Sequence, residues 1–312
     1  MKRFILKIIL LLLPIVILAI SMEYAIRHIP NDYRYKKNYL DKNSKDIQIL
    51  IVGGSESYYG VNPVYFSQNT FNAAHVSQTM DLNFKIINKY KNNFNNLKII
   101  IFPISYITLW NKLENAPDSW RIKNYAIYYG LKTKSLTDHS ELLNTTLGLN
   151  IKRLYKYYWE KKDDIYWSEF GWGTAYSESG NANNLEETGK VTALGHTFDM
   201  NSEIKTKIFA ENRQILDSLA AFCKQKNVKL ILITIPNYYT YREHLSKEQL
   251  NRMVETMDDF VAKHNNCYYI NWNEDPDFVA EDFHDADHLG EKGAEKLSKK
   301  LVSYIDSLSV SK

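Results

Sequence analysis

The chain has 312 residues, with 39 lysines and arginines against 36 aspartates and glutamates, which gives a net charge of +3. This balance is too even for a protein that binds nucleic acid by neutralising phosphates, and a hydrophobic fraction of 45% excludes wholesale disorder. The two cysteines, Cys223 and Cys267, exclude a disulfide-dense scaffold, and the sequence leaves open whether they pair.

The amino terminus predicts a membrane segment. An apolar run extends from Phe4 to Met22 after the basic residues Lys2 and Arg3, with Lys7 as its one charged residue. A helix needs about 20 apolar residues to cross a bilayer. Basic residues are retained on the cytoplasmic side of a membrane, so we expect the bulk of the protein to be extracytoplasmic.

A cleaved signal peptide is the alternative interpretation of this segment. Ala19-Ile20-Ser21 offers small residues at the spacing of a cleavage site, and the protein would then be secreted. The apolar run is longer than the roughly 7–15 residues of a secretory signal, which favours an uncleaved anchor. We therefore expect an anchor over residues 1–26, a polar linker over 27–45 and a folded domain over 46–312.

The folded domain alternates strand-like and helix-like patterns. Continuous apolar runs over 47–54, 97–105, 228–236 and 267–272 predict strands that are buried on both faces, as in a parallel sheet. Helical patterns begin at residue 80 and cover 202–226, 246–265 and 290–308. This order predicts an α/β fold with a doubly wound, flavodoxin-like, mostly parallel sheet.

Residues 107–200 interrupt the alternation and predict an insertion. They contain one helical pattern over 141–162 and a stretch over 168–195 that is rich in glycine, serine, asparagine and glutamate. We interpret the insertion as an extra subdomain or a lid. Its tryptophans and tyrosines either pack that subdomain or form a surface for a sugar or an acyl chain.

Polar groups follow the predicted strands at the ends where ligands bind in doubly wound folds. Gly53-Gly54-Ser55 follows the first strand, and Asp285-Ala286-Asp287-His288 lies after the fourth. Serine becomes a nucleophile when a base removes its proton, and the base must be oriented by an acid. In a helical turn, the spacing of Asp285 and His288 would place both side chains on one face. Ser55, His288 and Asp285 are therefore candidates for nucleophile, base and acid.

These blocks resemble those of the SGNH (GDSL-like) hydrolase superfamily, which has Gly-Asp-Ser after its first strand and Asp-x-x-His before its last helix. The run Leu289-Gly290-Glu291-Lys292-Gly293 is similar to the Leu-x-x-x-Gly run after the histidine of that family. The anchored arrangement is similar to that of the DltD and alginate O-acetylation proteins, which act on cell-envelope polymers. The resemblance covers residues 46–308 in order and is specific in its end blocks.

The expected oxyanion hole departs from the family pattern. The second block of the family supplies a glycine N–H where this sequence has Ser77, and the third block is Gly-x-Asn where it has Pro103-Ile104-Ser105. The resemblance implies that the N–H groups of the nucleophile and of Ser77, with the hydroxyl of Ser105, face the oxyanion. Asn72 or Gln78 is the candidate for the missing side-chain amide.

Four residues are candidates for contact with a substrate, namely Glu56, Tyr106, His284 and Trp172. His284 is also a rival base. Asp287 is a less suitable acid, because adjacent residues of a helix point in different directions. The remaining histidines have no metal-ligand spacing, so we expect neither a metal nor a cofactor.

Together these features predict an extracytoplasmic serine esterase or O-acyltransferase that acts on acyl esters, chiefly acetyl, of cell-surface polysaccharide. The implied partners are an acyl donor, a polysaccharide or other envelope glycan, the membrane and a membrane-bound acyl-transfer protein. The alternative is a catalytically degenerate module of the same fold that binds glycan or scaffolds an envelope assembly. The altered third block favours the alternative, whereas the intact serine, histidine and aspartate favour the enzyme.

Overall fold

The computed structural model describes residues 1–177 and 184–310, which form two compact units. One unit combines Met1–Asn38 with Pro117–Ile165, and the other combines Tyr39–Ala116 with Tyr166–Lys312. The insertion expected over 107–200 is thus divided between the units, and its residues 178–183 lie outside the described part of the chain.

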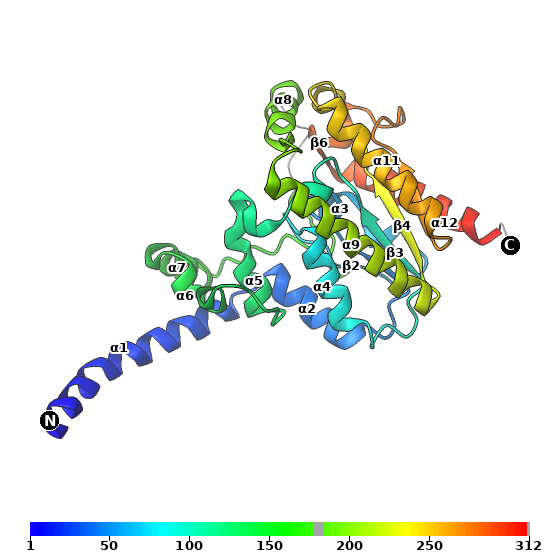
Figure 1. Ribbon diagram of the computed structural model, residues 1–312. Coiled ribbons are helices and arrows are strands. Elements are labelled where there is room, and N and C mark those ends of the chain that lie inside the picture. The colour runs from blue at the N-terminus through cyan, green and yellow to red at the C-terminus, as the bar shows by residue number, and fades with distance from the viewer. Residues whose placement is uncertain (178–183, 311–312) are drawn as a thin grey trace. The chain divides into compact units, whose positions relative to one another are not determined.

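The second unit contains a five-stranded parallel sheet with the order β2-β1-β3-β4-β5 (Figure 1). The strands are β1 (Ile49–Ile51), β2 (Thr70–Asn72), β3 (Ile99–Pro103), β4 (Lys229–Thr234) and β5 (Cys267–Asn271). The strand order reverses beside β1, and ligands bind at such a switch point in doubly wound sheets. The doubly wound, mostly parallel α/β fold expected from the sequence is confirmed, with β2 as an additional edge strand.

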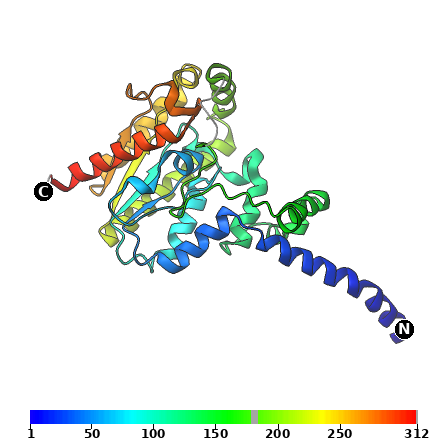
Figure 2. The same cartoon turned by 180° about the vertical axis from the view of Figure 1, so that it is seen from behind.

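Helices cover both faces of this sheet, which explains why its strands are apolar throughout. On one face, Ile101 and Ile233 share a buried cluster with Leu297 and Leu301 of α12 (Glu291–Val310). The other face carries α4 (Met80–Tyr90), α9 (Glu203–Lys226) and α11 (Lys247–Lys263), as comparison of Figures 1 and 2 shows.

The described part of the second unit contains further helices. They are α3 (Ser55–Gly60), α8 (Leu185–His196) and α10 (Tyr239–Arg242), with 3₁₀ turns over Pro63–Tyr65, Thr108–Trp110, Leu113–Asn115 and Ala280–Asp282. Cys223 and Cys267, whose pairing the sequence leaves open, are buried free thiols.

Two expected helix starts are confirmed by their caps. The Ser202 hydroxyl accepts from the N–H of Lys205 before α9, and the Ser246 hydroxyl accepts from the N–H of Gln249 before α11. Such caps satisfy backbone donors that have no partner inside the helix.

The first unit begins with the long helix α1 (Lys2–His28), which is apolar and long enough to cross a membrane or to be a signal sequence. Within the segment expected as a linker over 27–45, α1 continues to His28 and α2 covers Asp32–Asn43. The lysine, arginine and tyrosine residues that gave this segment its polar character are compatible with a helix.

The rest of the first unit is helical and irregular. It contains α5 (Ile122–Ile127), α6 (Glu141–Asn144), α7 (Leu147–Leu154) and a π-helical turn (Tyr155–Trp159), with 3₁₀ turns over Pro117–Arg121 and Leu136–His139. The single helix expected over 141–162 is interrupted, because Thr145 is extended and Thr146 precedes α7 as its cap residue. Inside this unit, Glu141 accepts from the Lys123 ammonium at 2.7 Å and from the Arg153 guanidinium at 2.9 Å.

Candidate active site

The turn after β1 places Ser55 at the first residue of α3. Gly53 has φ of +130°, which side-chain-bearing residues rarely adopt, and a Cβ there would lie 2.2 Å from Pro103 Cγ. The N–H of Gly53 donates to Oδ1 of Asn83 at 2.7 Å. This glycine lets the chain turn sharply beside β3, and the turn presents Ser55, partly exposed, beyond the carboxyl end of β1.

Asp285 and His288 lie on the two strands of a short antiparallel hairpin, β6 (Phe283–Asp285) and β7 (His288–Leu289). The helical turn expected for this motif is therefore wrong. The two side chains meet because the residues are cross-strand partners. The N–H of Tyr238 donates to the carbonyl of Ala286 at 2.8 Å, which fixes the turn of the hairpin.

The structure brings together the side chains of Ser55, His288 and Asp285. The Oγ of Ser55 lies 2.7 Å from Nε2 of His288, and Nδ1 of His288 lies 2.9 and 3.1 Å from the two carboxylate oxygens of Asp285. With the proton of the neutral imidazole on Nδ1, Nδ1–H donates to the carboxylate and Nε2 accepts from the serine hydroxyl. General-base activation of a serine requires this order of contacts.

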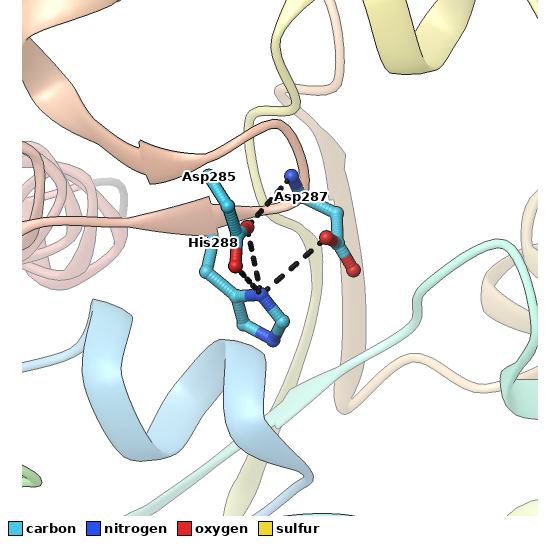
Figure 3. A group of neighbouring side chains, drawn as sticks. All are labelled: Asp285, Asp287 and His288. Atoms are coloured by element: carbon cyan, nitrogen blue, oxygen red, sulfur yellow. Dashed lines mark hydrogen bonds and ion pairs between the residues drawn. The ribbon is translucent and has the colours of Figure 1, made fainter. Parts of the chain in front are cut away.

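A second carboxylate, that of Asp287, also lies beside the imidazole (Figure 3). Its Oδ1 is 3.4 Å from Nδ1 of His288, and its backbone N–H donates to Oδ1 of Asp285 at 3.1 Å. Asp287 was expected to point away from the imidazole because adjacent residues of a helix point in different directions. In the hairpin that is observed instead, this argument does not apply. Asp285 is nevertheless the closer of the two carboxylates.

The two carboxylates change the proton affinity of the imidazole. Burial acts to lower the pKa of His288, but the charge of Asp287 and the hydrogen bond with Asp285 outweigh it and raise this pKa well above its ordinary value. Burial acts to raise the pKa of Asp287, but the neighbouring imidazolium lowers it to about 2. The site therefore stabilises an imidazolium at His288, as a base that takes the proton of a serine requires.

Within the described part of the chain, one group of side chains has ligand atoms close enough to hold a cation. Its members are Asp285, Asp287 and His288, and their ligand atoms all lie within 4.8 Å of one another. A nitrogen with carboxylate oxygens is a donor set that suits several divalent ions. The carboxylates already face Nδ1 of the imidazole, so an ion bound to that nitrogen would break the bond between Asp285 and His288.

A stack of three aromatic rings borders the imidazole. Tyr176 lies between Tyr59 and His284, with ring-centroid distances of 3.8 and 3.6 Å. Tyr59 and Tyr176 also lie at 6.2 and 5.7 Å from the ring of His288, in edge-on geometry. His284, the rival base, is thus part of this stack, and burial lowers its pKa. Sequence reasoning missed Tyr176, because its glycine- and serine-rich surroundings carry no pattern that singles it out.

Asn72 is not placed as an oxyanion donor, so this expectation is wrong. Its Nδ2 donates to the carbonyl oxygens of Ser57 at 2.8 Å and Val61 at 2.9 Å, and its Oδ1 accepts from the N–H of Ala74 at 3.0 Å. The buried amide therefore ties the end of β2 to α3, on which Ser55 lies.

The loop that contains Ser77 lies against the nucleophile turn. The N–H of His75 donates to the carbonyl of Gly53 at 3.4 Å, and the carbonyl oxygen of Gln78 lies 3.6 Å from the position of a Cβ on Gly54. Ser77 has φ of +59°, in the left-handed region that favours glycine. This conformation is consistent with the glycine that the SGNH superfamily has in its second block. The Gln78 side chain donates elsewhere, to the Ala73 carbonyl and the Asn83 side chain.

Ser105 lies just beyond β3, at the same edge of the sheet. Its N–H donates to Oγ1 of Thr108 at 2.8 Å, and its hydroxyl lies 2.9 Å from that same oxygen. When Thr108 is the donor between the two hydroxyls, the proton of Ser105 is free to point elsewhere. Ser105 thus retains a donor for an oxyanion.

Two expected substrate contacts are structural instead. Tyr106 is 3% exposed, and its hydroxyl accepts from the N–H of Ser246 at 3.0 Å. Trp172 is 7% exposed, and its indole N–H donates to the carbonyl of Tyr59 at 2.6 Å. Both expectations are wrong, because these large rings pack the protein around the site. Glu56, which follows the nucleophile, stays a candidate because it is partly exposed.

Comparison with known proteins gives structural matches alone. No family model matches the sequence, and no curated protein matches it. The structure is similar to a protein described provisionally as an acylhydrolase from Bacteroides fragilis, at 9% identity and a TM-score of 0.40, over 87% of this chain and 96% of that one. It is also similar to a protein described provisionally as a platelet activating factor from Streptococcus pneumonia, at 11% identity and a TM-score of 0.42, over 95% and 98% of the chains.

A third solved structure is a GDSL-like lipase from Bacteroides thetaiotaomicron, with 12% identity and a TM-score of 0.37, over 88% of this chain and 100% of that one. At these scores the similarities bear on neither activity nor substrate, and the chemistry must be argued from the site itself.

Proposed function

We propose that this protein is a serine esterase or O-acyltransferase. The observation that carries the proposal is the continuous line of contacts from Oγ of Ser55 through the His288 imidazole to the Asp285 carboxylate. In the first step Oγ attacks the carbonyl carbon of an ester, and its proton passes to Nε2 of His288. The N–H groups of Ser55 and Ser77, with the hydroxyl of Ser105, would donate to the oxyanion.

The reaction would then proceed through an acyl-enzyme. The tetrahedral intermediate collapses, the C–O bond to the alcohol breaks, and His288 returns the proton to the leaving oxygen. A second oxygen nucleophile, whose proton passes to the same imidazole, attacks the acyl carbon on Ser55. The bond from that carbon to Oγ then breaks, and His288 returns the proton to Oγ. Water gives hydrolysis, and a sugar hydroxyl gives O-acyl transfer.

The proposed substrate is an acyl ester, chiefly acetyl, of a cell-surface polysaccharide, and the partners are its acyl donor and a membrane-bound acyl-transfer protein. The support is the resemblance in the end blocks together with the amino-terminal helix. We propose that α1 is an uncleaved anchor and that the second unit is extracytoplasmic, because Lys2 and Arg3 precede the apolar run.

A serine-directed fluorophosphonate tests the chemistry on the full-length protein. Labelling should be lost in Ser55→Ala and retained in Ser57→Ala. Ser57 is a matched control, because it lies in the same helix, is fully buried, and its hydroxyl has no hydrogen-bond partner among the described residues. Absence of labelling in a folded parent protein would instead favour the glycan-binding or scaffolding module.

A partition experiment separates the two acyl acceptors. Release of acetate from a model ester is timed with and without an oligosaccharide that carries free hydroxyls. An O-acyltransferase would divert acyl groups from water to the oligosaccharide in proportion to its concentration. An unchanged acetate yield at every concentration would leave hydrolysis as the activity.

A further inference from the structure

One helical segment of the first unit carries a row of apolar side chains on its surface. Helix α7 and the π-helical turn after it expose Leu147, Ile151, Tyr155 and Trp159, which are 58%, 52%, 53% and 76% accessible. Their four-residue spacing places them along one side of the helix, which we call the apolar stripe. Asn150, in the same helix, is fully buried.

The carboxyl-terminal part of α1 is fixed to the start of α6 and, after it, to the π-helical turn of this segment. The carboxylate of Glu23 accepts from the hydroxyl of Ser140 at 2.9 Å and from the N–H groups of Glu141 and Leu142, each at 3.0 Å. The hydroxyl of Tyr158 donates to the carbonyl of Ala25 at 3.1 Å. In Figures 1 and 2, α6 and α7 accordingly lie beside the end of α1.

The apolar surface of α1 continues onto α6, which precedes this segment. Ala19 and Ile20 of α1 line a groove of about 440 Å³ together with Leu142 and Leu143, and Leu143 is 71% exposed. The long side chains of α1 from Phe4 to Ile20 are themselves exposed. Because the two apolar surfaces meet at a groove, the simplest expectation is that the same apolar environment covers both.

The length of α1 sets the depth at which the segment would lie. At 1.5 Å per residue, the helix from Phe4 to Glu23 is about 29 Å long, which matches the hydrocarbon core of about 30 Å. Glu23 and the chain that it binds would therefore lie at the level of the lipid headgroups. Tyrosine and tryptophan rings are favoured at that level, and Tyr155, Tyr158 and Trp159 provide them.

We propose that α7 and its π-helical turn lie in the headgroup layer of the bilayer, with the apolar stripe toward the acyl chains. This inference rests on the proposed role of α1 as a membrane anchor. Lys152, next to the stripe, would reach outward to lipid phosphates. The unit would thus be attached to the membrane by a spanning helix and by a second helix that lies along the surface.

Spin labels on the full-length protein in phosphatidylcholine–phosphatidylglycerol nanodiscs test this inference. Cysteines are introduced one at a time at Leu147, Ile151 and Lys152, and at Leu12 in α1. Cys223 and Cys267 are buried, and the unsubstituted protein measures their background labelling. Collisions of each label with oxygen, which concentrates in lipid, are compared with collisions with a water-soluble nickel chelate.

We expect labels at 12, 147 and 151 to collide preferentially with oxygen, and the label at 152 to collide preferentially with the nickel chelate. Labels at 147 and 151 that favour nickel, while label 12 favours oxygen, would overturn the inference and leave the anchor intact. Labels at 147 and 151 that reach neither reagent would also overturn it, because protein would then cover the stripe. A label at 12 that favours nickel would overturn the anchor itself.

Discussion

Asp285 and His288 face one another across the β6–β7 hairpin, so the bond between the proposed acid and base is formed within one local element. The bond between His288 and Ser55, in contrast, joins residues 233 positions apart and depends on the packing of the whole sheet. The hairpin therefore delivers a prepared acid–base pair, and the turn after β1 delivers the nucleophile.

The two carboxylates beside His288 should contribute unequally to catalysis. Asp285→Asn replaces the carboxylate whose oxygens lie 2.9 and 3.1 Å from Nδ1 of His288 by a neutral amide, and we expect kcat to fall by about 10³–10⁴ because the imidazole loses its charged, two-oxygen partner. Asp287→Asn alters a longer contact of 3.4 Å and leaves Asp285 to hold the imidazole, so kcat should fall less, by about tenfold. Steady-state rates of ester hydrolysis measure both, and equal losses would contradict this assignment of roles.

The pH dependence should report the raised pKa of His288. A protonated imidazole cannot accept the proton of Ser55, so activity is lost on the acidic side, and a raised pKa moves that loss to a higher pH than 6.5. Asp287→Asn removes a negative charge that favours the imidazolium, so the midpoint of kcat/KM should shift to lower pH. A shift to higher pH, or none, would show that the charge of Asp287 does not act on the base.

Tyr176 should affect the rate through the position of His288. Tyr176→Ala removes the middle ring of the aromatic stack, and we expect kcat to fall by about 10–100-fold, as for a displaced catalytic group. Tyr176→Phe keeps the ring and is the matched control, with activity near that of the parent protein. If Tyr176→Ala raised KM while kcat stayed constant, the ring would be a substrate contact instead.

The turn at Gly53 should tolerate no side chain. Gly53→Ala combines an unfavourable φ of +130° with atoms of Pro103 at 2.2 and 2.6 Å, and we expect a loss of about 2–4 kcal/mol in the free energy of unfolding. Gly195→Ala is the control, because a Cβ there meets nothing within 4 Å. Chemical denaturation, monitored by circular dichroism, measures the stability of both variants. Similar denaturation midpoints would show that Gly53→Ala introduces no strain.

The buried ion cluster of the first unit should hold that unit together. The side chain of Glu141 is 1% exposed and binds both Lys123 and Arg153. Glu141→Ala would leave the buried Lys123 ammonium without this partner, and we expect a local loss of about 3–5 kcal/mol. Hydrogen exchange of residues 117–165 would accelerate, while exchange in the parallel sheet would serve as the internal reference. Unchanged exchange over 117–165 would show that the cluster contributes little.

The sequence was sufficient to predict the strands that are buried on both faces of the sheet. Continuous apolar runs such as Val228–Pro236 are typical of such strands. The sequence was insufficient for β2, since Thr70–Asn72 is a three-residue edge strand with a polar residue at each end. Helix α2 was not expected for a related reason: its many polar residues have a composition that fits a linker as well as a helix.

For the site, the residue types at the strand ends identified Ser55, Asp285 and His288 as a group, and the structure brings them together. The backbone between Asp285 and His288 was misjudged, because a spacing of three fits both a helical turn and a hairpin with a two-residue turn. Tyr176 and the buried amide of Asn72 depend on which side chains meet in three dimensions, and no local pattern encodes that.

The bonds from Glu23 to the chain around α6 prevent α1 from rotating about its long axis independently of that part of the protein. A membrane-spanning helix held in this way, as proposed for α1, would pass any change in its tilt to the segment that it binds. When bilayer thickness changes, a free span can adjust its tilt alone, whereas this one would carry the α6–α7 segment with it. Lipid composition would thereby set the inclination of the whole first unit.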